Sequence, residues 1–157
     1  MSAIFSLTSI WAGCEKSTIN EHLLSLKIDS LKKQITGAYI PGTGEIMNGI
    51  IQPHHYKLWL AGQTKNWKLA AYESDLLEGG FKRIEKYHHG SKTAEAIPMI
   101  NPELTAINKA IRNKDKIEFK NGFVLLTNAC NTCHSAMGYD FNIIKVPSKP
   151  AFENQQF

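Results

Sequence analysis

A 4-3-4-3-4 spacing of apolar and sulfur-containing residues constrains the fold of this chain more than any other feature. The residues are Phe119, Phe123, Leu126, Cys130, Cys133 and Met137. Residues three and four apart lie on one face of an α-helix, so the spacing predicts a helix over about 116–137 with one buried stripe. Both cysteines belong to that stripe, so we expect the group that they bind to lie in the interior of the fold.

The end of the stripe carries a second pattern, the C-x-x-C-H run of residues 130–134. This run is the attachment sequence of c-type haem. The thiols of Cys130 and Cys133 add to the two vinyl groups of the porphyrin, and the residues between them give one helical turn of reach. The imidazole of His134 then ligates the iron from the proximal side. The sequence therefore predicts one covalent haem c per chain.

Zinc sites and thiol redox centres also use C-x-x-C pairs. A structural zinc site needs four ligands, and only one further cysteine, Cys14, is present, near the other end of the chain. A thioredoxin-like pair is expected in a βαβ context, and no such alternation precedes Cys130. Haem attachment is the preferred interpretation, with zinc or redox use as the alternatives.

The chain after residue 43 contains four amphipathic helical segments. The first covers about 45–61, and Pro53 should kink or restart it. The second covers about 65–87, with an interruption at Gly79-Gly80, and a loop is expected over 88–98. The third begins with Asn101 as N-cap, and the fourth is the 116–137 helix. No segment alternates with period two over a strand's length, so the fold class is all-α, with a four-helix bundle over residues 44–157.

The N-terminal 14 residues are apolar and end in Ala12-Gly13-Cys14. This pattern is typical of a lipoprotein signal, in which Cys14 is lipidated after cleavage, and an ordinary N-terminal helix with a free cysteine is the alternative. Lipidation and c-haem attachment both occur outside the bacterial cytoplasm. We therefore expect a lipid-anchored protein on the periplasmic side of a membrane.

Residues 15–43 are predicted to form a helical stalk and a linker. Leu24, Ile28, Leu31 and Ile35 make a short heptad seam, which predicts either self-association into a homo-oligomer or packing of this helix on the domain. At the other end of the chain, an apolar, proline-interrupted segment predicts an irregular strap over the bundle. Its residues are Phe141, Ile143, Ile144, Val146, Pro147, Pro150 and Phe152.

A C-x-x-C-H run on the last of four helices resembles the class II c-type cytochromes, the cytochrome c-prime group. The resemblance implies thioether bonds at Cys130 and Cys133 and proximal ligation by His134, and the strap departs from the group's pattern. The stretches 55–59, 66–70 and 128–134 also resemble bacterial haem-binding lipoproteins of unassigned function.

Whether a side chain ligates the iron on the side opposite His134 decides between electron transfer and gas binding. Met137 lies one turn beyond His134 and cannot reach that side. Met47, His54 and His55 are the candidates in the first bundle helix, with an open site as the other possibility. His54 and His55 point about 100° apart, so only one of them can face the iron. We favour His55, because Trp59 and Gly62 on its face suit a flat ring.

Trp59 and Trp67 are then expected to line the haem pocket, and plain core packing is the alternative for each. Glu73 and Asp75 are interpreted as surface charges. We find no paired carboxylates, phosphate-binding glycine loop or Ser/His/Asp arrangement, so an enzyme is not expected.

The preferred function is electron transfer to or from an unidentified redox partner protein. The first alternative is binding or sensing of NO or CO, and the second is a non-haem lipoprotein. The formal charge of +4 and the pI near 8.9 would suggest an acidic partner, but the two propionates of a haem would lower this positive charge. The sequence has no basic block with interleaved aromatic residues, so nucleic-acid binding is not expected.

Overall fold

The computed structural model describes residues 15–37, 39–149 and 155–157, which divide into two units, Met1–Ile40 and Pro41–Phe157. The described residues are helical or irregular and contain no β-strand, which confirms the all-α prediction. None of their helices is both long and apolar enough to cross a membrane. The predictions for residues 1–14, lipidation of Cys14 included, and for Pro150 and Phe152 lie outside the described residues.

The first unit contains α1 (Glu15–Thr36). Within it, the heptad residues Leu24, Ile28 and Leu31 are exposed. The side chain of the fourth heptad residue, Ile35, lies outside the described part. Self-association of this helix therefore stays a prediction.

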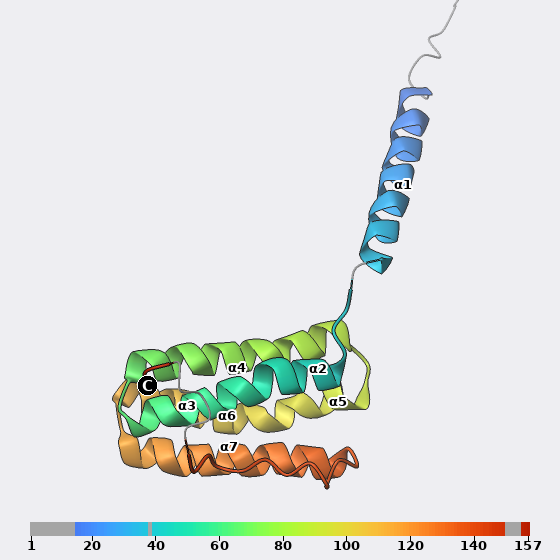
Figure 1. The fold of residues 1–157 in the computed structure, drawn as a ribbon. Coiled ribbons are helices and arrows are strands. Elements are labelled where there is room, and N and C mark those ends of the chain that lie inside the picture. The colour runs from blue at the N-terminus through green and yellow to red at the C-terminus, as the bar shows by residue number, and fades with distance from the viewer. Residues whose placement is uncertain (1–14, 38, 150–154) are drawn as a thin grey trace, which may run out of the picture. The chain divides into compact units, whose positions relative to one another are not determined.

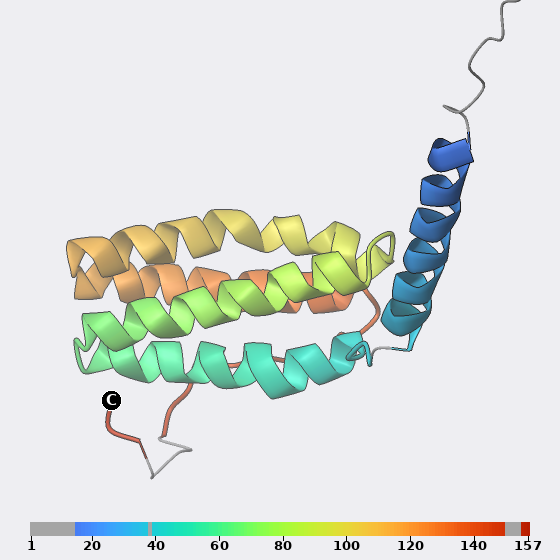
Figure 2. The same ribbon diagram turned by 90° about the horizontal axis from the view of Figure 1, so that it is seen from above.

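The second unit holds the remaining helices (Figures 1 and 2). In chain order they are α2 (Thr43–Ile46), the π-helix η1 (Met47–Ile51), α3 (Gln52–Gln63), α4 (Trp67–Tyr87), α5 (Lys92–Ala96), the 3-10 helix η2 (Ile97–Ile100), α6 (Asn101–Asn113) and α7 (Lys116–Ala136). The long helices contact one another in a closed cycle, because α3 and α6 each touch both α4 and α7. They enclose one hydrophobic core.

The apolar stripe predicted for residues 116–137 forms part of this core. Phe119, Phe123 and Leu126 of α7 are fully buried, and Cys133 is 3% exposed at the end of the same stripe. The stripes of α4 and α6 are buried as well, through Ala70, Ser74, Leu77, Phe81 and Ile84 and through Leu104, Ile107 and Ile111. For α7, the local spacing therefore predicted which face of the helix packs inward.

Helix boundaries differ from the prediction in three places. Helix α4 runs unbroken through Gly79-Gly80. Residues 88–98 are not a continuous loop, because the Ser91 side chain accepts a hydrogen bond from the Ala94 amide and starts α5. Because η2 runs directly into α6, Ile100 rather than Asn101 occupies the N-cap of that helix.

Pro53 lies at the start of α3, which begins directly after the π-helical turn η1. Proline has no N–H to donate to the residue four positions earlier, so the α-helical ladder cannot pass through it unchanged. The Gln52 amide instead bonds to the Met47 carbonyl five residues back, and α3 begins at Gln52. This turn lets the side chains of residues 47–51 face a different direction from those of a regular helix.

Gly62 makes the tightest glycine contact of the core, and we expect Gly62→Ala to destabilise the fold. A Cβ there would lie 2.0 Å from the Phe119 ring, an overpacking that costs about 1–3 kcal/mol. Gly79 is the matched control, since a Cβ there meets nothing within 4 Å and alanine should stabilise the helix by about 0.5–1 kcal/mol. Urea unfolding of both variants measures the difference, and equal midpoints would contradict it.

Candidate haem site

The C-terminal end of α7 presents the C-x-x-C-H run. The helix begins at an N-cap, Asp115, whose side chain accepts hydrogen bonds from the amides of Ile117 and Glu118. Twenty-one residues later the helix ends with Met137 as C-cap. Cys133 is buried, while Cys130 and His134 are half-buried.

The chain reverses immediately after the helix. The Tyr139 amide bonds to the His134 carbonyl at 2.8 Å, and the Gly138 amide bonds to that of Ser135 at 3.0 Å. These bonds form a Schellman motif. Its C′ residue, Gly138, has φ +79°, a left-handed conformation that costs other residues about 1–2 kcal/mol. The following segment, residues 139–149, therefore runs back along α7 (Figure 1).

This returning segment, which we call the strap, contacts the imidazole of His134. The His134 Nδ1 lies 2.6 Å from the Asn142 carbonyl oxygen. A carbonyl can only accept, so Nδ1 carries a hydrogen, and in the neutral form of the ring the lone pair lies on Nε2. Iron-ligating histidines have this tautomer, with the outer ring nitrogen bonded to a carbonyl or carboxylate.

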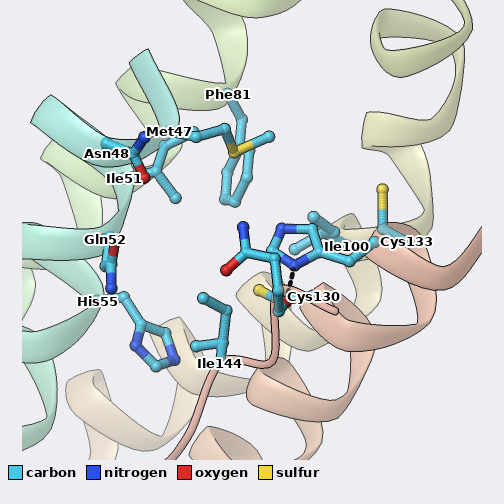
Figure 3. A pocket seen from close by; sticks show the side chains of 12 residues that line it. Met47, Asn48, Ile51, Gln52, His55, Phe81, Ile100, Cys130, Cys133 and Ile144 are labelled. Carbon is cyan, nitrogen blue, oxygen red and sulfur yellow. Dashed lines mark hydrogen bonds between the residues drawn. The ribbon is translucent and has the colours of Figure 1, made fainter. Parts of the chain in front are cut away.

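Cys130, Cys133 and His134 are among the residues that line one pocket. Figure 3 shows this pocket and labels most of its lining residues. Its space of about 490 Å³ includes a part that is open to solvent. Helix α7 and the strap form one side, and η1 and the start of α3 form the other. The lining residues are Met47, Asn48, Ile51, Gln52, His55, Phe81, Ile100, Cys130, Cys133, His134, Asn142 and Ile144.

A second hollow adjoins this pocket and shares five of its residues. They are Met47, Asn48, Cys133, His134 and Asn142. Met47 is half-buried and packs against the edge of the core. It therefore borders both hollows together with the proposed proximal ligand.

His55 lines the pocket and is only 4% exposed. Its Nε2 lies 3.0 Å from the Thr127 Oγ1, and that hydroxyl donates to the Phe123 carbonyl at 2.8 Å. Since the hydroxyl proton is used there, the His55 Nε2 carries the hydrogen and donates to Thr127. Burial lowers the pKa of His55 from 6.5 to about 4, so the ring is neutral at pH 7.

The burial of His55 predicts a loss of stability in mild acid. The unfolded chain binds this proton near pH 6.5 and the folded chain only near pH 4, so the contribution of His55 is complete above pH 6.5 and is lost as pH falls toward 4. The full loss is on the order of 3 kcal/mol.

The variant His55→Gln keeps an amide donor for Thr127 and does not titrate. We expect its free energy of unfolding, measured in urea at pH 7 and pH 4.5, to fall less with acid than that of the wild type. Equal acid losses in the two proteins would contradict the assignment.

His54 does not reach the pocket. Its Nδ1 lies 2.6 Å from the Glu73 Oε2 on α4, and Glu73 is 1% exposed. The interpretation of Glu73 as a surface charge was therefore wrong, whereas Asp75 is exposed. The sequence contained the signal, because Glu73 lies three residues after Ala70 and four before Leu77 on the buried face of α4.

The two tryptophans are half-buried, pack against the core and do not line the pocket. Trp59 packs against Phe119 and Phe123, with ring centroids 6.3 and 4.9 Å apart. Trp67 meets Phe119 edge-on at 6.0 Å. Neither tryptophan is among the pocket-lining residues. Of the predicted site residues, the structure brings together Cys130, Cys133, His134 and His55, with Met47 beside them.

The surroundings of the two thiols favour their protonated form. Burial and the neighbouring Cys133 raise the pKa of Cys130 to about 12, and burial also raises that of Cys133. Redox-active C-x-x-C pairs instead have lowered pKa values. Among the described residues, no three His, Cys, Asp or Glu side chains gather into a metal site. A haem iron needs fewer protein ligands, because the porphyrin supplies four.

Comparison with known proteins adds no family to this description. The chain matches no protein-family model, no curated protein and no solved structure.

Proposed function

We propose that this chain is a monohaem c-type cytochrome that transfers electrons on the periplasmic side of a bacterial membrane. The observation that carries the proposal is the C-x-x-C-H run facing a pocket, with the His134 Nδ1 donating to the Asn142 carbonyl. That bond leaves the Nε2 of His134 available for iron.

The haem would be held by thioether bonds to Cys130 and Cys133 and by the Nε2 of His134. When bound, it supplies an iron that cycles between the ferric and ferrous states by one electron. The apolar residues Ile51, Phe81, Ile100 and Ile144 would exclude water from the ring. Such exclusion disfavours the more highly charged ferric state and tends to raise the reduction potential.

We further propose Met47 as the ligand opposite His134, in preference to His55. His55 on α3 bonds to Thr127 on α7. The two helices run antiparallel, and this bond marks positions at which they lie side by side. His134 lies seven residues beyond Thr127 on α7, which is about 10 Å along the axis. Counting seven residues back from His55, toward the N-terminus of the facing helical segment, gives residue 48, which is next to Met47. A thioether ligand suits an electron carrier with a raised potential.

The finer architecture belongs to the same proposal. We infer a four-helix bundle in which α3 with α2 and η1 forms the first helix, followed by α4, α6 and α7. The closed cycle of contacts among these helices supports it. Residues 139–149 would form the predicted strap and α1 the predicted stalk. The lipid anchor at Cys14 is proposed from the sequence alone.

An optical spectrum of the exported protein tests the proposal. After expression in a host that matures c-type cytochromes, the full chain should carry covalent haem and show a low-spin spectrum when oxidised and when reduced. Carbon monoxide should bind slowly. A high-spin spectrum with rapid CO uptake would favour gas binding over electron transfer, and a colourless protein would exclude both.

A further inference from the structure

The strap crosses α7 at a residue inside the C-x-x-C-H run. Asn131 is one of the two residues between the cysteines, and its side-chain amide makes two hydrogen bonds to the backbone of Ile144. Its Nδ2 donates to the Ile144 carbonyl at 2.9 Å, and its Oδ1 accepts from the Ile144 amide at 2.8 Å. The carboxamide thus forms with Ile144 a pair of hydrogen bonds, one to its carbonyl and one from its amide, like those between paired residues of antiparallel strands.

This pair of bonds fixes the position of the carbonyl that meets the axial histidine. Asn131 and His134 are three residues apart and lie on the same face of α7. The strap runs antiparallel to the helix, so Ile144 lies beside Asn131 while Asn142, two residues earlier, lies beside His134. Because only one residue separates Asn142 from Ile144, holding Ile144 also restricts the Asn142 carbonyl.

Further contacts hold the strap on either side of this point. The Schellman motif at Gly138 fixes where the strap leaves α7. Beyond Ile144, Val146 packs against the core, and the Tyr56 hydroxyl donates to the Lys149 carbonyl. The strap is thus attached on both sides of Ile144, and Asn131 is the α7 side chain that holds it two residues beyond Asn142.

We propose that Asn131 is a positioning residue for the axial ligand and sets the reduction potential of the haem through the strap. The inference rests on the proposed function, because it concerns the iron that His134 would ligate. A carbonyl that accepts the Nδ1 hydrogen makes the imidazole a stronger electron donor and favours ferric iron. Releasing the strap weakens this bond, and the potential then rises.

The test compares Asn131→Ala with Thr132→Ala in the exported holoprotein. Thr132 is the other residue between the cysteines, it is exposed, and its hydroxyl bonds only to the Asn128 carbonyl of its own helix. We expect all proteins to carry covalent haem. A redox titration should show a higher potential for Asn131→Ala than for the wild type and Thr132→Ala. The iron–histidine stretching frequency of the ferrous, CO-photolysed protein should be lower in Asn131→Ala than in the wild type and should be unchanged in Thr132→Ala.

A second variant keeps the inference testable if Asn131→Ala does not accumulate. Asn131→Ser also removes the carboxamide that makes both bonds to Ile144 and leaves every pocket-lining residue in place, so its potential should also rise. Holoproteins with unchanged potentials and stretching frequencies would overturn the role of Asn131 and leave the cytochrome proposal standing. A wild type without covalent haem would overturn both.

Discussion

Replacing Cys130 and Cys133 together with serine is expected to abolish covalent haem attachment. Serine keeps the size of the side chain but has no thiol to add to a vinyl group. The wild type, exported through c-type maturation, should gain the mass of one haem and keep its colour through denaturation and acid-acetone extraction. The double variant should lose that colour completely under the same treatment.

Thr132→Ala is the control for this experiment, because it changes the same run without touching a proposed haem bond. It should retain covalent haem like the wild type. A colourless wild type that instead holds stoichiometric zinc would refute the haem assignment.

Replacing Met47 with leucine is expected to convert a low-spin haem into a high-spin form that binds carbon monoxide. Leucine fills nearly the same volume but cannot ligate iron, so the packing of η1 should change little. The absorbance band of the sulfur–iron bond should disappear, and the reduction potential should shift. Optical spectra with and without CO and a redox titration measure both effects.

His55→Ala and His54→Ala are the comparisons that decide the ligand. His55 lines the same pocket, so a change of spin state in His55→Ala with an unchanged spectrum in Met47→Leu would restore the sequence-based choice of His55. His54→Ala should leave the spectrum unchanged, because His54 bonds to Glu73 outside the pocket. A wild type that is already high-spin would show that neither residue ligates.

The sequence by itself determined the all-α class, the inward face of the last helix and the pair of cysteines at the end of its apolar stripe. These features follow from helical periodicity, in which residues three and four apart share a face whatever the helix packs against. The buried Glu73 was readable by the same rule. It was missed because a carboxylate is rarely buried unless another element supplies a partner, here His54.

Only the tertiary structure decided how the site is completed. The bond between His55 and Thr127 depends on the register between two helices about 70 residues apart in the chain. The same register places Met47 near His134. The bonds from Asn131 to Ile144 and from His134 to Asn142 depend on how the strap returns after Gly138. Local spacing cannot fix either arrangement, because register and chain reversal are set by the packing of the whole core.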